Sequence, residues 1–93
     1  MSKSVIHKFT LGLTSRQSVA MPVGSIILSI QAQNNNLTLW AMVDTEETEK
    51  EDRYFRVYGT GEEVTQSEGR FLATVQLDRL VFHVFEIWKD QWL

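Results

Sequence analysis

The sequence contains no cysteine, a single proline and only two histidines among its 93 residues. Without cysteine there is no disulfide, no thiolate zinc site and no cysteine nucleophile, and small secreted domains often depend on disulfides. No apolar run approaches the roughly 20 residues that span a bilayer, and the N-terminus has no signal-peptide pattern. These absences predict a cytoplasmic protein without a membrane segment.

Positive charge is also scarce, with nine Lys and Arg against twelve Asp and Glu and a net charge of −3. Non-specific affinity for nucleic acid depends on clustered basic side chains, so neither DNA nor RNA is expected as a partner. The apolar fraction of 43% is that of an ordinary globular protein, and the length suits one core. We therefore expect a single domain over residues 1–93.

Short runs in which apolar residues alternate with polar ones dominate the sequence, separated by Gly, Asn and Asp. Short connections favour antiparallel strands. The prediction is an all-β fold, an antiparallel β-sandwich or small barrel of about six to seven strands with one short helical turn near the C-terminus. Strands are expected over residues 5–13, 17–21, 25–33, 37–43, 53–58, 70–77 and 80–88, with turns at 22–24, 34–36 and 78–79.

The alternation also assigns side chains to faces, because successive residues of a strand point to opposite sides. The acidic residues 44–52 include no apolar side chain and predict a solvated loop, with a short helical turn as the alternative. The first strand is expected to place Val5, Phe9, Leu11 and Leu13 on one face, and the third strand Ile26, Leu28, Ile30 and Ala32.

Gly59-Thr60-Gly61 comes nearest to a phosphate-binding motif, because glycine amides can hold an anion. The complete motif ends in Gly-Lys-Ser/Thr, whereas Glu62 and Glu63 follow here, so we interpret it as a structural turn with a phosphate loop as the alternative. His7 and His83 lie in apolar strands, away from the carboxylates in sequence. We expect no metal site, no cofactor and no catalytic residue, and therefore not an enzyme.

The strongest candidate for a binding site is one face of strand 53–58. Tyr54, Arg56 and Tyr58 alternate along it, and two rings beside a guanidinium can stack on and pair with a small nucleotide. In the alternative interpretation, these side chains lie on the solvent-exposed outer face of a sheet without binding a ligand, and the other face of the sheet packs in the core. Further anion contacts are expected from Thr60 and from Arg70 or Arg79.

Three tryptophans are large for so small a domain to cover. Aromatic residues are enriched in protein interfaces. Packing in the core or the tail is the alternative for each one. We expect at least one of Trp40, Trp88 and Trp92 to lie in an interface with a second copy of the chain or with a partner protein.

Several short sequence segments are distinctive: Met21-Pro22-Val23-Gly24 with Ile27-Leu28, then residues 39–44 (Leu-Trp-Ala-Met-Val-Asp), Gly59-Thr60-Gly61, and residues 80–86 (Leu-Val-Phe-His-Val-Phe-Glu). Together they resemble a family of small bacteriophage and prophage proteins of unknown function, over most of the chain. The resemblance implies a phage setting and assigns no residue a role.

In that setting, small proteins without catalytic motifs often act by binding. The predicted function is a non-enzymatic phage accessory protein in the host cytoplasm that counters bacterial defence, in its more specific form by sequestering a small nucleotide immune signal. The alternative is a protein–protein inhibitor of a host or defence enzyme, steered by its acidic loops and anchored by exposed aromatics. A small enzyme or a virion component is a third class.

Overall fold

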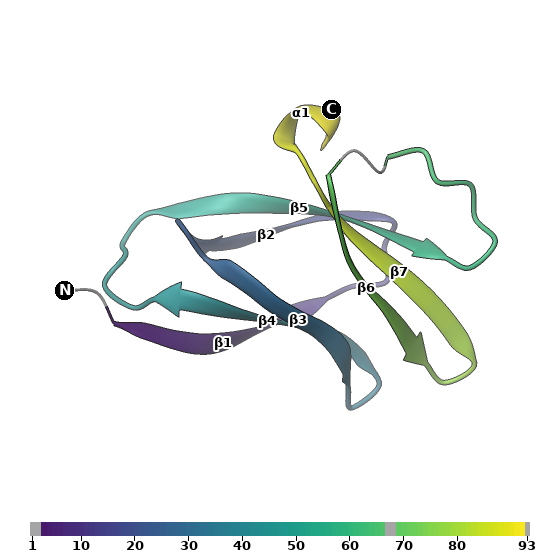
Figure 1. Ribbon diagram of the computed structural model, residues 1–93, viewed down its shortest axis with the longest axis horizontal. Helices are drawn as coiled ribbons and strands as arrows, with labels where there is room; N and C mark the ends of the chain where they lie inside the picture. Colours follow the sequence, from purple (N-terminus) through teal and green to yellow (C-terminus); the bar gives the residue numbers. More distant parts are fainter. Residues whose placement is uncertain (1–2, 67–68, 93) are drawn as a thin grey trace.

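The computed structural model describes residues 3–66 and 69–92, in which seven strands and one short helix follow each other along the chain (Figure 1). The strands form two antiparallel sheets that do not close into a barrel, so the predicted all-β sandwich is confirmed. The elements are β1 (Ser4–Leu11), β2 (Arg16–Pro22), β3 (Ile26–Gln33), β4 (Asn36–Asp44), β5 (Lys50–Gly59), β6 (Arg70–Leu77), β7 (Leu80–Ile87) and α1 (Lys89–Trp92).

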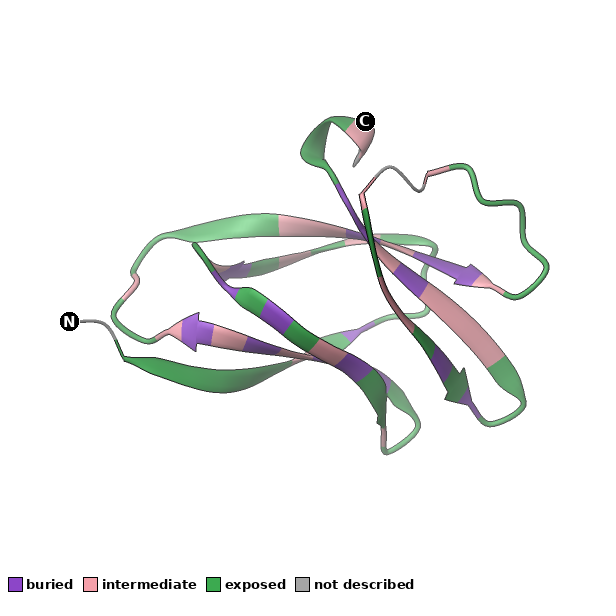
Figure 2. Ribbon diagram, viewed as in Figure 1, coloured by how far each residue is buried: buried purple, intermediate pink, exposed green. Residues whose placement is uncertain are grey.

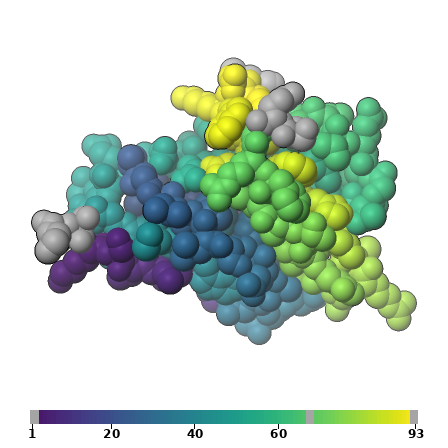
Figure 3. Space-filling model, in the orientation of Figure 1, coloured from purple at the N-terminus to yellow at the C-terminus, as the bar shows by residue number. Residues whose placement is uncertain are grey.

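The three-stranded sheet has the order β1-β4-β3, and the four-stranded sheet the order β2-β5-β7-β6. The first two strands therefore join different sheets. On one side of the sandwich the edge strands β3 and β6 lie side by side (Figure 3). On the other side the edges are β1 and β2, and Figure 2 shows β1 exposed over nearly its whole length.

The core lies between the two sheets and is built from their facing side chains. Period-two alternation is clearest in β4, where every second residue from Leu37 to Val43 is buried against the other sheet, and it continues in β5 at Phe55 and Val57. Fully covered apolar side chains include Leu37, Leu39, Ala41 and Val43 of β4, Phe55 and Val57 of β5, and Val84 of β7.

Both predicted hairpins form, because residues with short polar side chains accept positive φ at their tips. Asn34 (φ 50°) and Asn35 (φ 61°) make a two-residue turn between β3 and β4, and Asp78 (φ 54°) begins the turn between β6 and β7. The amide of Asn35 donates to the carboxylate of Asp78 at 3.0 Å. The two hairpin tips, one from each sheet, are therefore tied together.

The predicted turn before β3 is confirmed, and β2 is an edge strand of the four-stranded sheet. Gly24 has a φ of 83°, and Ser25 donates to the carbonyl of Pro22 through both its backbone N–H and its hydroxyl. Positive φ at the third position of such a turn requires glycine or asparagine.

Leu13 is not part of β1, so the prediction that it shares a core face with Leu11 is wrong. The strand ends at Leu11 because the side-chain amide of Gln17 binds both the N–H and the carbonyl of Gly12, at 2.9 and 2.8 Å, and turns the chain toward β2. Leu13 lies exposed in this connection.

The face assignment in β3 is also wrong. Ile27 and Ile30 are buried, whereas Ile26 and Leu28 are 52% and 48% exposed. The cause is a register shift between Ile27 and Ser29, where β3 carries an extra residue relative to β4. Such a bulge inverts the alternation on its two sides, so a regular pattern cannot assign both halves of the strand.

The acidic loop is shorter than predicted, because β5 begins at Lys50 rather than at residue 53. Lys50, Glu51 and Asp52 pair with the end of β2, where Glu51 lies opposite Met21. Backbone pairing with β2 thus extends the strand through residues that have no strand-forming side chains.

Candidate functional site

The candidate residues Tyr54, Arg56 and Tyr58 share the outer face of the four-stranded sheet, as their alternation predicts. Across β7 they lie opposite Ile87, Phe85 and His83, respectively. Phe55 and Val57 point to the core instead. Two hollows lie near the two ends of β5, and Tyr54 lines the larger one whereas Tyr58 lines the smaller one.

Tyr58 holds the segment after β5 against the sheet. Its hydroxyl accepts hydrogen bonds from the backbone N–H groups of Thr65 (3.2 Å) and Gln66 (2.8 Å) and from Arg56 Nε (3.1 Å), and it donates to the carbonyl of Gln66. The side chain is only 1% exposed. In this arrangement the ring is covered by the protein itself and offers no surface for a ligand to stack on.

Burial raises the pKa of the Tyr58 hydroxyl, but the bonds from Thr65, Arg56 and Gln66 favour the ionised form and together lower the pKa below its ordinary value. Arg56 makes two further contacts in this region: its guanidinium lies 4.7 Å from the Tyr58 ring centroid, and its Nη2 donates to the hydroxyl of Thr65. Arg56 is thus also committed to anchoring this segment.

The smaller hollow, of about 260 Å³, lies at the end of β5 and is lined mainly by apolar and aromatic side chains around His83. The Thr60 hydroxyl is 2.8 Å from His83 Nε2, and the Thr74 hydroxyl is 2.9 Å from Nδ1. Both ring nitrogens therefore have hydroxyl partners.

The Gly59-Thr60-Gly61 segment forms a turn, as the structural interpretation requires. The Gly59 N–H donates to the carboxylate of Glu62 at 2.8 Å, and the Thr60 N–H donates to the carbonyl of Val81 at 3.2 Å. Two of the amides that a phosphate loop would direct at an anion are therefore already bonded, one of them to a carboxylate.

The larger hollow, of about 600 Å³, lies where β5 begins and β7 ends, next to α1. Its volume is within the range of small-molecule sites. Of the predicted site residues, Tyr54 and Arg70 line it, whereas Arg56, Tyr58, Thr60 and Arg79 do not. The lining consists of Glu51, Asp52, Arg53, Tyr54, Arg70, Glu86, Ile87, Trp88 and Lys89.

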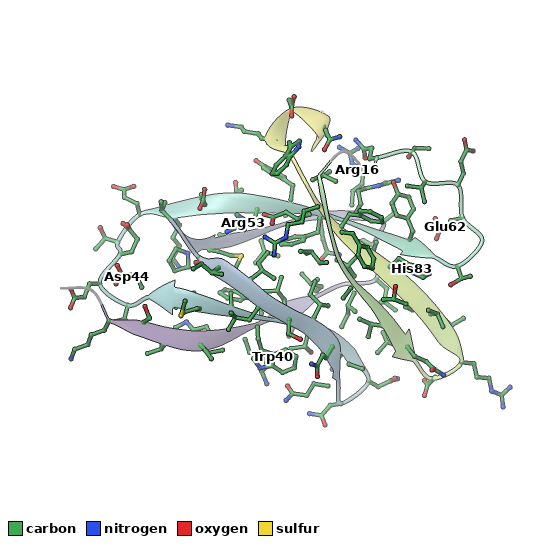
Figure 4. The ribbon with its side chains drawn as sticks, viewed as in Figure 1. Arg16, Trp40, Asp44, Arg53, Glu62 and His83 are labelled. Carbon is green, nitrogen blue, oxygen red and sulfur yellow. The ribbon has the colours of Figure 1, made fainter. Side chains whose placement is uncertain are left out.

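Arg53, labelled in Figure 4, forms a salt bridge with Glu86, and both residues line this hollow. Arg53 Nε lies 2.5 Å from Glu86 Oε2, and Nη2 lies 3.1 Å from Oε1. Arg53 Nη1 donates to the carbonyl of Ser25, which precedes β3, at 2.8 Å. The guanidinium therefore links the two sheets.

The hydrogen bonds to Glu86 raise the pKa of Arg53 above its ordinary value, against the opposing effect of burial. The two charges largely neutralise each other. The remaining charges of the hollow are the basic Arg70 and Lys89 and the acidic Glu51 and Asp52.

Sequence reasoning missed Glu86, Trp88 and Lys89 as lining residues, although a signal exists for Glu86. In β7 it keeps the phase of the buried Val84, and in β5 Arg53 keeps the phase of the buried Phe55. Two opposite charges in the core phase of two strands predict a pair. The positions of Trp88 and Lys89 follow only from the placement of α1.

The three tryptophans lie in different places, and no partner chain tests them as interface residues. Trp40 is half-buried on the outer face of the three-stranded sheet, opposite Lys8 and Ser29. Trp88 is 54% exposed beside the larger hollow. Trp92 is in α1, and its side chain lies outside the described part of the structure.

Among residues 3–66 and 69–92, no three His, Cys, Asp or Glu side chains are grouped so as to hold a metal ion. Within the same ranges, no helix has the length and apolar character needed to cross a membrane.

The family model of a domain of unknown function, DUF7352, matches residues 2–92. The chain belongs to this family. The DUF7352 match spans both sheets and α1, so the whole fold described above is the family's domain. Comparison with curated proteins and with solved structures finds no match. Any function must therefore be argued from the side chains of this chain.

Proposed function

We propose that the chain is a non-enzymatic binding protein that holds a small nucleotide in the larger hollow. The observation that carries the proposal is that two aromatic and two basic side chains line the same hollow of about 600 Å³. Tyr54 and Trp88 can stack on a base, and Arg70 and Lys89 can pair with phosphate. This moves the predicted site along β5, away from Arg56 and Tyr58.

The charge of the hollow favours a ligand of low charge. Arg53 is bound to Glu86, so the other charged residues of the lining are the basic Arg70 and Lys89 and the acidic Glu51 and Asp52. Carboxylates near a triphosphate would oppose its binding, whereas they can accept hydrogen bonds from the amino groups of a base. A cyclic nucleotide, with one negative charge per phosphate, fits this balance better than a nucleoside triphosphate.

The wider role that we propose is sequestration of a nucleotide immune signal by a phage accessory protein in the host cytoplasm. A protein that binds such a signal without turning it over lowers its free concentration in proportion to the number of sites. The phage setting rests on the resemblance of the sequence, and the ligand class rests on the hollow.

Native mass spectrometry with a panel of cyclic and linear nucleotides tests the ligand class. We expect a mass increase of one ligand per chain with a cyclic nucleotide and a weaker one with triphosphates. Arg70→Ala and Trp88→Ala should abolish the increase. Arg79→Ala is the matched control, because Arg79 is exposed in the β6–β7 turn and does not line this hollow. No mass increase across the panel, or equal losses in all three variants, would contradict the proposal.

A second candidate is inhibition of a host or defence enzyme by direct protein contact. It is favoured by the outer face of the three-stranded sheet, where Ile6, Met42 and Ile26 form one row across the strands. Ile6 and Ile26 are 61% and 52% exposed. A pull-down from host lysate should then return one stoichiometric partner, and Ile26→Lys should lose it.

A further inference from the structure

We infer that β1 is a pairing edge through which two copies of the chain join, so that two three-stranded sheets become one six-stranded antiparallel sheet about a two-fold axis. This interaction surface does not depend on the nucleotide site, which lies in the other sheet. It also differs from the tryptophans that the sequence suggests as interface residues.

The direction of the backbone groups of β1 follows from its pairing with β4. Lys3 continues the register beyond Ser4 and Asp44, and its carbonyl accepts from the N–H of Thr45 at 2.9 Å. Hydrogen-bonded pairs recur at every second residue of an antiparallel ladder, so the odd-numbered residues of β1 bond to β4. The N–H and carbonyl groups that face away from the sheet belong to Ser4, Ile6, Lys8 and Thr10.

This edge lacks the features that usually protect an edge strand. Natural edges carry outward lysines, prolines or bulges, and β1 contains no proline and pairs with β4 without a register shift. Its one charged side chain, Lys8, reaches away from the edge across β4, where Nζ donates to Gln33 Oε1 of β3 at 2.9 Å. The Lys8 side chain therefore lies over the outer face of the sheet and does not place its charge at the edge, where it would oppose pairing with another strand.

The other edges of the sandwich differ from β1. β3 and β6 lie against each other. In β2, the bond from the Val57 N–H to the Ser15 carbonyl fixes the even-numbered residues as the outward ones, and these include Arg16 at one end and Pro22 at the other. Proline offers no N–H to a neighbouring strand, and an arginine adds charge.

The core-side face of β1 is also incomplete in one copy. Val5 and His7 lie opposite the buried Val43 and Ala41, yet Val5 is 37% exposed and His7 is exposed. The four-stranded sheet does not cover this corner. A neighbouring strand of the same sequence would set its own Val5, His7 and Phe9 beside them.

A second copy is the occupant that this edge suits best. A two-fold axis pairs an antiparallel strand with the same strand of the second copy, so the same face of each strand lies on the same side of the joined sheet. Val5 and His7 of both copies then lie on the core side, and Ile6 of both copies lies on the outer side. Within β1 the charged side chain is Lys8, which Gln33 of the same chain engages, and Lys3 lies just before the strand at its end. Nothing in β1 therefore requires a complementary charge from a different protein.

Sedimentation analysis across a range of protein concentrations tests the inference. We expect a species of twice the 10.8 kDa chain mass. Lys8→Pro should convert it to the monomer, because it removes an outward N–H and no bond to β4. Lys8→Ala should keep the dimer, since it loses the Gln33 contact but keeps the N–H. Ala32→Pro, at an exposed residue whose N–H points outward on β3, should also keep the dimer.

Amide hydrogen exchange provides a second measurement that does not depend on the proline variant folding. The amides of Ile6, Lys8 and Thr10 should exchange at least about tenfold more slowly at high protein concentration than at low, and the amide of Ala32 should not change. A monomer at every concentration would overturn the inference, as would a dimer that survives Lys8→Pro.

Discussion

Arg53 of β5 holds both carboxylate oxygens of Glu86 of β7 on the face of the sheet that the sandwich covers. Because the third arm of the guanidinium reaches the carbonyl of Ser25, one charged pair links three segments and both sheets. Their side chains are 17% and 10% exposed, so water screens the pair only weakly.

Removing one partner of this pair should destabilise the fold more than removing both. Glu86→Ala leaves the Arg53 guanidinium buried without its carboxylate, and we expect a loss of about 3 kcal/mol in the free energy of unfolding. The double variant Arg53→Met with Glu86→Leu should lose less, because apolar side chains of similar size need no partner. Urea unfolding measures all three proteins. A double variant that is less stable than Glu86→Ala would show that the pair itself stabilises the fold.

Tyr58→Phe should release the segment after β5 while leaving the sandwich intact. The substitution removes the hydroxyl that accepts from Thr65 and Gln66, and leaving these two partly buried donors unsatisfied should cost about 1 kcal/mol in total. We expect faster amide exchange at these two residues and little change in β4. Tyr54→Phe is the matched control, and equal effects of the two variants would argue against this role of Tyr58.

The Tyr58 hydroxyl should also make stability depend on alkaline pH. Its pKa is lowered in the folded state, so its ionised form is favoured by folding. The contribution is complete above the ordinary value of 10.0 and is lost as pH falls through the lowered folded value. The stability difference between wild type and Tyr58→Phe should therefore increase as pH rises toward that value. A difference that stays constant or shrinks would contradict the direction of the shift.

Gly69→Ala should strain the start of β6. A Cβ at this position would lie 1.7 Å from the carbonyl oxygen of Glu86 and 2.6 Å from the Cα of Ile87, so the backbone of β7 would have to move. We expect a loss of about 2 kcal/mol or more, as in overpacked sites. Gly12→Ala is the control, because the nearest atom to its Cβ would be 3.7 Å away. Thermal unfolding compares the two, and equal melting temperatures would exclude a tight approach at Gly69.

Much of the fold is predictable because local chemistry and global structure agree. Asn34 and Asn35 accept the positive φ of a tight hairpin, and Gly24 serves the turn after Pro22. The face of Tyr54 and Arg56 follows from alternation alone. In each case the information lies within a few neighbouring residues.

The errors arise where distant residues decide the local structure. The bulge at Leu28 depends on the register with β4, and the early start of β5 depends on pairing with β2. The burial of Tyr58 depends on a segment that folds back onto the sheet. The larger hollow needs the ends of β5 and β7 and the helix α1 in one place, which no sequence pattern specifies.

The order of the strands also determines when each can find its partner. Among the strands of residues 3–66 and 69–92, only β3–β4 and β6–β7 are pairs of consecutive strands, whereas β1 pairs with the later strand β4 and β2 with the later strand β5. During synthesis, the first strand pair that can form is the hairpin closed by Asn34 and Asn35, and the four-stranded sheet is complete only when β7 emerges. Such non-local pairing slows folding, because the chain loses the entropy of closing long loops before the stabilising contacts between the strands form. Until then the apolar strands at the N-terminus remain exposed to other chains, so expression at low temperature or beside a chaperone should increase the yield of folded protein.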